Sequence, residues 1–260
     1  MRSLAYRRFE LVRTFRNSLA YTRLEVVRTF RNVRLLVFSF GFPLVLYFLI
    51  AAPNRHQHNF NGSGISIPLY YMVGLVAFGA MTALISSGAR IASERTDGWT
   101  RQLRITPLAT TAYFGAKVIT GYTLATLTIV LLYASGVSLG VSLSAGRWLE
   151  MTGLIIVALI PFAALGIFLG HLLTADSIGP AIGGLVSLLA LVSGTWFPIG
   201  SHGILHDVGQ FLPSYWLVRA SHVGVGGHAW SATGWIMIAA SAVTLAALAR
   251  FACRRDTARV

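Results

Sequence analysis

The sequence contains few charged residues and only one cysteine. Charged side chains make up 11% of its 260 residues, whereas roughly 25% is usual in a soluble domain. The single Cys253 excludes a secreted domain built on disulfides. An apolar content of 55% excludes a disordered chain. The composition therefore indicates a membrane protein.

Six apolar runs are long enough to cross a bilayer as helices, which takes about 20 residues each. We predict an all-α membrane protein in which six transmembrane helices form one domain over residues 35–250. A helical segment (1–34) precedes this domain, and a basic tail (251–260) follows it. The predicted spans are Leu35 to Ala52, Ile65 to Ala89, Ala116 to Leu143, Met151 to Thr174, Ile178 to Phe197 and Trp230 to Ala249.

The basic residues are concentrated on one side of the predicted spans. Of 21 lysines and arginines, 18 precede the first span, lie between the second and third, or follow the sixth. Positively charged loops tend to stay in the cytoplasm, so we predict that both termini are cytoplasmic. No nucleic-acid-binding motif accompanies the net charge of +13, and we expect no nucleic-acid partner.

The first 32 residues contain a tandem repeat. Residues 3–17 and 18–32 are identical at twelve of fifteen positions. Apolar residues share one helix face and arginines occupy the remainder, which predicts a long amphipathic helix in the plane of the inner membrane interface. There it would contact anionic membrane lipids. A second copy adds no new chemistry, so we expect one copy to be sufficient.

The loop after the second predicted span has an unusual composition. Two short helical runs, Ile91 to Thr96 and Trp99 to Ile105, flank the turn pair Asp97-Gly98. Apolar residues here favour an element that docks a cytosolic partner over an ordinary solvated connector. We predict that residues 90–114 form this element, with a polar rim made by Glu94, Arg95, Arg101 and Arg104.

These motifs together resemble the ABC type-2 exporter permeases, which are the six-span subunits of bacterial drug, lipid and polysaccharide exporters. The matching residues after span two are Glu94-Arg95, Gly98, Leu103-Arg104 and Thr106-Pro107. Between spans five and six, the match covers Ser193 to Pro198 and Leu212 to Trp216. Two features depart from the family pattern: the repeat, and Arg101, where relatives commonly have an acidic residue.

The resemblance implies a permease of the bacterial cytoplasmic membrane that exports its cargo. It also implies two kinds of partner, a second permease subunit, identical or different, and cytosolic ABC ATPases that bind ATP and Mg²⁺. The ATPase-coupling residues that it implies are Glu94, Arg95, Gly98, Trp99, Leu103, Arg104, Thr106 and Pro107.

The segment between spans five and six, residues 197–227, contains enough apolar residues to dip into the bilayer. It is too short to cross the bilayer twice as full helices. We therefore predict a re-entrant lid over the external end of a pathway, bounded by Phe197, Pro198, Leu212 and Pro213. His202 and His206 lie four residues apart in this segment, but no cysteine or second carboxylate completes a metal site, and we expect no metal.

The spans contain almost no ionisable residues, which disfavours a carrier driven by protons or sodium and favours an amphiphilic or hydrophobic cargo. Candidate pathway residues carry hydroxyl groups, although helix packing explains any one of them as well; they are Tyr70, Thr82, Ser86, Ser187 and Ser193. The only lysine, Lys117, follows Ala116, so no phosphate-binding loop of the Walker type exists in this sequence. Energy must come from a partner.

We therefore predict a permease subunit that forms half of the pathway of an ATP-driven exporter for drug-like compounds. It would have no catalytic residue and no cofactor of its own. A lipid or polysaccharide exporter is the alternative within this class. Outside the class, the alternatives are an intramembrane enzyme, for which the nearest candidates are His171 and Asp176, and an accessory membrane protein without a transport role.

Overall fold

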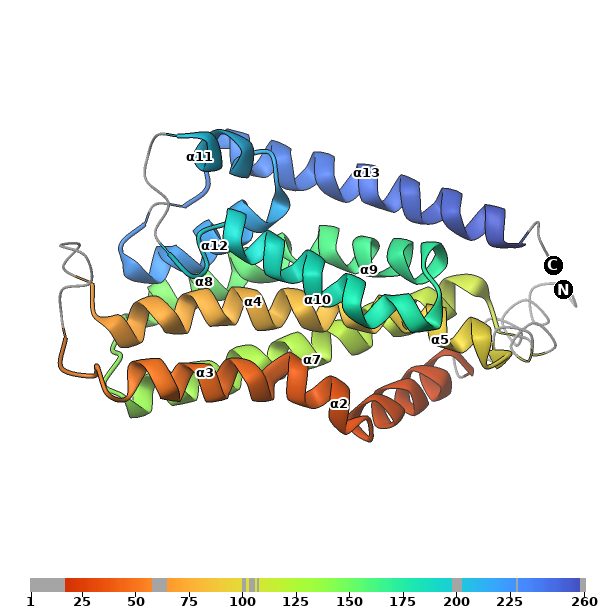
Figure 1. Ribbon diagram of the computed structural model, residues 1–260, viewed down its shortest axis with the longest axis horizontal. Coiled ribbons are helices and arrows are strands. Elements are labelled where there is room, and N and C mark those ends of the chain that lie inside the picture. Colours follow the sequence, from red (N-terminus) through yellow and green to blue (C-terminus); the bar gives the residue numbers. More distant parts are fainter. Residues whose placement is uncertain are drawn as a thin grey trace, which may run out of the picture.

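The structure is a computed structural model that describes residues 17–57, 65–99, 102, 106, 108–197, 203–227 and 229–257. These residues form an elongated bundle of helices and contain no strand (Figure 1). Residues 17–30 form an N-terminal helix. The elements after it are α2 (Val33–Leu36), the π-helix η1 (Val37–Gly41), α3 (Phe42–Ala51), α4 (Ile67–Ala89), α5 (Ile91–Thr96), α7 (Thr110–Ser138), α8 (Ala145–Ala158), α9 (Ile160–Leu172), α10 (Ala175–Val192), α11 (Ile204–Gly209), α12 (Pro213–His222), η3 (Val223–Val225) and α13 (Ala232–Thr257).

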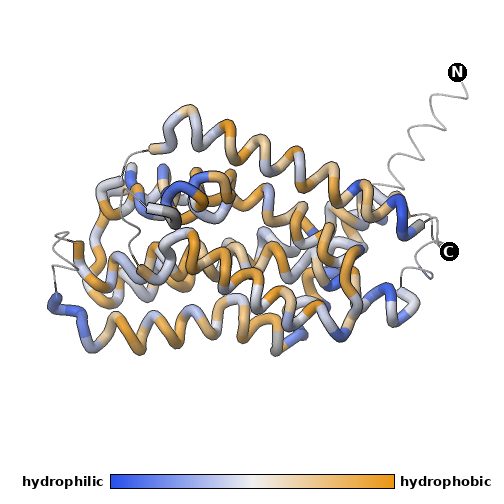
Figure 2. Tube along the Cα trace, turned by 45° about the horizontal axis from the view of Figure 1, so that its top comes forward, coloured by the Kyte–Doolittle hydropathy of each residue, from blue (hydrophilic) through white to orange (hydrophobic). Residues whose placement is uncertain are grey.

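Five helices in the described part of the chain are long and apolar enough to cross a membrane. They are Ile67–Thr96, Thr110–Ser138, Ala145–Leu172, Ala175–Val192 and Ala232–Asp256. They lie where the sequence predicts spans two to six. Figure 2 shows hydrophobic residues along the long helices and hydrophilic residues mainly toward the two ends of the bundle. The all-helical fold is therefore confirmed, and five of the six predicted spans coincide with helices that could cross a membrane.

The region of the first predicted span has a shorter apolar helix, Val37–Ala51, next to a local irregularity. Pro43 has no N–H group, so it cannot donate to the carbonyl of Ser39 four residues earlier. That carbonyl accepts a 3.4 Å hydrogen bond from Thr128 Oγ1 on α7, and the N–H of Phe42 donates to the carbonyl of Val37. A π-turn results. The helical backbone nevertheless continues through α2, η1 and α3.

Helix α4 forms the centre of the bundle. It packs mainly against α7 and α9, and 83% of its most apolar stretch is buried. The corresponding stretches of α10 and α13 are only 17% and 11% buried. A helix that is apolar on all sides is expected in such a central position, whereas α10 and α13 present most of their apolar surface outward.

Two glycines allow α4 and α9 to touch along their backbones. A Cβ atom added to Gly88 would lie 2.5 Å from the backbone nitrogen of Ile167. One added to Gly166 would lie 2.5 Å from the carbonyl oxygen of Ile85. Any larger residue would push the helices apart. This contact fixes the end of α4 against the middle of α9, and the short helix α5 that follows also packs against α9.

Three segments meet at one end of the bundle, on the right in Figure 1: the N-terminal helix, α5 and the C-terminal end of α13. We call this the basic end. The short helices α11 and α12 lie toward the opposite end. Helix α12 is largely buried, and the indole nitrogen of Trp216 donates to the carbonyl of Gln210 at 2.8 Å.

The residues predicted to bound a lid differ in their surroundings. Phe197 is 68% exposed, Leu212 is half-buried, and Pro213 occupies the first turn of α12. Pro198 lies outside the described residues. The segment thus contains the two short helices α11 and α12, and the re-entrant lid itself stays a prediction.

Candidate functional site: a buried ionic network at the basic end

The lysine on α7 lies between two carboxylates. Lys117 Nζ is 2.6 Å from Glu25 Oε1 on the N-terminal helix and 2.5 Å from Glu94 Oε1 on α5. All three residues are at most 1% exposed. A buried charge is tolerated only when it is paired and hydrogen-bonded, so these contacts hold three segments of the chain together.

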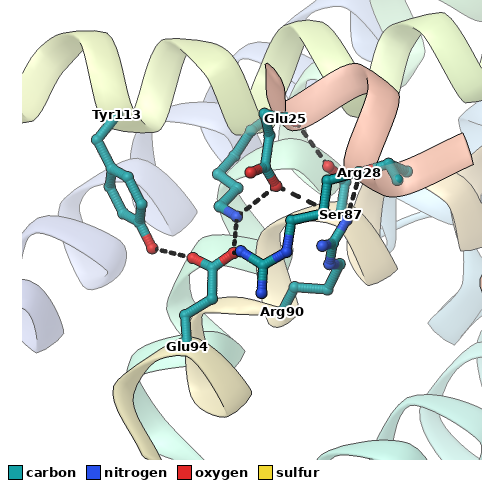
Figure 3. A network of polar contacts seen from close by, with 8 residues as sticks. Glu25, Arg28, Ser87, Arg90, Glu94 and Tyr113 are labelled. Carbon is teal, nitrogen blue, oxygen red and sulfur yellow. Dashed lines mark hydrogen bonds and ion pairs between the residues drawn. The ribbon is translucent and has the colours of Figure 1, made fainter. Parts of the chain in front are cut away.

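Five further residues belong to this network, which is shown in Figure 3; one of them, Ser87, donates its hydroxyl hydrogen to the carbonyl of Lys117 at 2.8 Å. Tyr113 donates its hydroxyl hydrogen to Glu94 Oε2 at 2.6 Å. Arg28 Nη1 lies 3.6 Å from Glu94 Oε1, and Arg90 Nη1 lies 3.7 Å from Glu25 Oε1. Arg90 also donates to Thr29 Oγ1. Three cations therefore surround two carboxylates.

Each segment contributes to the network through residues on one face of a helix. Glu25 and Thr29, Arg90 and Glu94, and Tyr113 and Lys117 are three pairs spaced four residues apart. Side chains with this spacing lie on the same side of a helix. The polar face of the N-terminal helix thus packs against α5 and α7. Its apolar residues are exposed instead, and they include Leu19, Leu24, Val27 and Phe30.

Helix α5 makes a second set of contacts through the residue next to Glu94. Arg95 donates to the carbonyl of His171 at 2.9 Å, at the end of α9, and pairs with Asp256 on α13 at 2.7 Å. Asp256 also lies 3.0 Å from His171 Nδ1. Adjacent residues of α5 therefore bind different parts of the bundle, so a shift of α5 would disturb both sets of contacts.

The sequence predicted Glu94 on an exposed polar rim, and this placement is wrong. Glu94 is 1% exposed because its carboxylate neutralises the buried Lys117. The side chain of Arg95 is 32% exposed, and Thr106 is exposed. Leu103, Arg104 and Pro107, together with Arg101, lie outside the described residues.

The predicted turn after α5 is present. Gly98 has a φ of +70°, a conformation that glycine adopts without strain. The half-buried ring of Trp99, which follows, has its centroid 5.3 Å from the guanidinium carbon of Arg28. This cation–π contact connects the start of the loop to the N-terminal helix.

The structure does not gather the predicted pathway residues into one lined passage. Tyr70 donates to the carbonyl of Gly194 at 3.2 Å, which joins α4 to the segment after α10. Ser193 contacts Thr195 of the same segment at 3.1 Å. Thr82 donates to a carbonyl of its own helix. Ser86 is half-buried and Ser187 is exposed on α10. These contacts fit helix packing.

Comparison with known proteins assigns the chain to a family of membrane transport subunits. The sequence model of the ABC-2 family transporter protein matches residues 53–251. The chain belongs to this family, and it is an ABC type-2 permease.

One curated relative is "Putative transport permease YvfS" of Bacillus subtilis (strain 168), which is 31% identical over 150 residues. The match covers 56% of this chain and 61% of the relative. The chain thus spans less than two thirds of the length of that relative.

Proposed function

We propose that the chain is the permease subunit of an ATP-driven exporter and that helix α5 receives the motion of a separate ATPase. The observation that carries this proposal is that two adjacent residues of α5, Glu94 and Arg95, bind different parts of the bundle. Glu94 binds Lys117 beside the N-terminal helix, and Arg95 binds the ends of α9 and α13. An element bound to helices on both sides can transmit a displacement to both.

In this proposal the basic end is cytoplasmic. The chain crosses the membrane six times, with the helix through η1 and α3 as the first span. The N-terminal helix lies at the membrane interface with its apolar face toward lipid. The segment of α11 and α12 forms a re-entrant lid at the external end. A second permease subunit, identical or different, supplies the other half of the pathway.

The cargo is an amphiphilic or hydrophobic compound of the drug or antibiotic class, exported from the cell. The surroundings of Lys117 support this choice, because Glu25 and Glu94 neutralise the charge of this buried lysine. It is therefore not available to couple transport to an ion gradient. ATP would be hydrolysed by the partner, and ATP and Mg²⁺ would bind there.

Co-purification tests the docking assignment. The double substitution Leu103→Ala and Arg104→Glu should abolish recovery of a cytosolic ATPase with the tagged chain in mild detergent. Leu149→Ala is the matched control, because Leu149 is 74% exposed on α8, away from the loop, and its variant should retain the ATPase.

Two further measurements complete this test. The purified chain alone should hydrolyse no ATP, whereas its complex should show ATPase activity that responds to an amphiphilic substrate. Unchanged recovery of the ATPase with the double variant would exclude the loop as the docking element.

A further inference from the structure

A cavity of about 520 Å³ opens at the basic end between the N-terminal helix and α5. Three arginines from these two segments line it. The lining residues are Arg28, Arg31, Asn32, Val33, Arg90, Ser93, Glu94 and Asp97. The cavity adjoins the ionic network through Arg28, Arg90 and Glu94, whereas Lys117 is buried and does not line it.

The three arginines retain hydrogen-bonding capacity toward this cavity. Arg28 pairs with Glu94 at 3.6 Å through its buried Nη1 atom, and its side chain is otherwise 40% exposed. Arg31 is exposed, and the described part of the chain offers it no ion-pair partner. Each guanidinium carries five N–H donors, and Arg90 uses few of them.

The residues that line the cavity include three arginines but only two carboxylates, Glu94 and Asp97, so positive charge is in excess. Glu94 already accepts from Lys117 and Tyr113. Asp97 is exposed, and it is the remaining acid of the lining. An anion in the cavity would therefore lie toward the arginines and away from Asp97. Guanidinium groups match phosphate oxygens in geometry as well as in charge.

We infer that this cavity binds the phosphodiester headgroup of a membrane phospholipid. The inference goes beyond the proposed function and does not depend on it. An apolar ridge, a row of exposed apolar residues that starts at the cavity, favours a lipid over a free phosphate as the ligand. Val33 lines the cavity, and exposed apolar residues continue along the same helix; they are Val37, Phe42, Val45 and Leu49.

The spacing of these ridge residues follows the turns of the helix. Val33 and Val37 are one turn apart, and the π-turn places Phe42 next to Val37, whose carbonyl accepts the Phe42 N–H. Val45 and Leu49 follow at intervals of three and four residues. Acyl chains can lie along this ridge while the phosphate remains among the arginines.

Lipid retention by the purified full chain tests the inference. The delipidated protein is titrated with dioleoyl phosphatidylglycerol, and bound lipid is measured by native mass spectrometry. Dioleoylglycerol has the same acyl chains without the phosphate. We expect the protein to bind the phospholipid, and Arg31→Gln to weaken its affinity about tenfold, as the loss of one hydrogen bond between charged groups would do.

Arg23→Gln provides the matched control. Arg23 is an exposed arginine of the N-terminal helix that does not line the cavity, so its variant should bind the phospholipid as the wild type does. Equal weakening by both substitutions would show general surface attraction and overturn the inference. Equal binding of dioleoylglycerol would also overturn it, because the ridge alone would then suffice. Displacement of the phospholipid by inorganic phosphate would identify a site for free phosphate instead.

Discussion

The replacement Lys117→Met tests the energetic role of the network. Glu25 Oε1 and Glu94 Oε1 contact the same nitrogen atom at 2.6 and 2.5 Å. Without the ammonium group, two buried carboxylates would remain no more than about 5 Å apart. At an effective dielectric constant of about 20, two unit charges at this distance repel by about 3 kcal/mol.

Arg28 and Arg90 offset part of this repulsion, since each lies close to one of the carboxylates. Removal of one partner from a buried ion pair nevertheless costs about 3–5 kcal/mol in general. We therefore expect Lys117→Met to lower the free energy of unfolding by about 3 kcal/mol. Titration with sodium dodecyl sulfate, in detergent solution, measures this loss.

A second variant separates the charge effect from a packing effect. The triple substitution Lys117→Met, Glu25→Gln and Glu94→Gln keeps the side-chain volumes similar and removes all three charges. It should recover about half of the lost stability, because neutral groups of similar size often replace a buried ion pair without loss. A loss below about 1 kcal/mol for Lys117→Met, or a triple variant no more stable than the single one, would refute this reasoning.

Four other variants have clear expected outcomes. Deletion of residues 3–17 should leave membrane insertion and transport nearly intact. Deletion of residues 18–32 should do the same, because Glu10 and Thr14 then occupy the sequence positions of Glu25 and Thr29 before Val33. Thermal unfolding of each single-deletion variant measures whether the fold is kept. A lower unfolding temperature in either variant would contradict this prediction. Deletion of both copies should destabilise the protein, because it removes one carboxylate from Lys117. Gly166→Val should cost at least about 1–3 kcal/mol, since its Cβ would lie 2.5 Å from Ile85 O; an unchanged unfolding temperature would show that α4 and α9 do not touch there.

The sequence predicted the long apolar helices well, because each is a continuous apolar run bounded by polar or turn residues. It also predicted the turn at Gly98, where glycine is the residue that the backbone favours. The short first helix was harder to anticipate. Pro43 was visible in the sequence, but the π-turn before it depends on a contact with Thr128, 89 positions from Ser39.

The ionic network could not be found from the sequence, because its members are distant along the chain. Lys117 is 92 positions from Glu25 and 23 from Glu94. The sequence does contain a partial signal: one lysine within an apolar run, with a tyrosine four residues before it. A buried lysine requires acidic partners, and with only eight acids in the chain the search for them is short.

The partners of the N-terminal helix could not be predicted from the sequence for the same reason. The amphipathic pattern predicted an apolar face and a basic face, but it could not show that Glu25 and Thr29 would be buried against α5 and α7. The sequence predicted that the arginines of this segment contact lipid, and the structure shows that Arg28 and Arg31 also line a cavity. Local periodicity gives the faces of a helix, whereas the partner of each face depends on the tertiary structure.

The most direct test of the proposed coupling is the ATPase activity of the reconstituted complex with Glu94→Gln. This variant keeps the shape of the side chain and removes the charge that holds Lys117. We predict that the ATPase still co-purifies and still hydrolyses ATP, but that an amphiphilic substrate no longer stimulates it. Asp97→Asn, three residues further on and exposed, should keep full stimulation. Full stimulation in a folded Glu94→Gln complex would contradict the account.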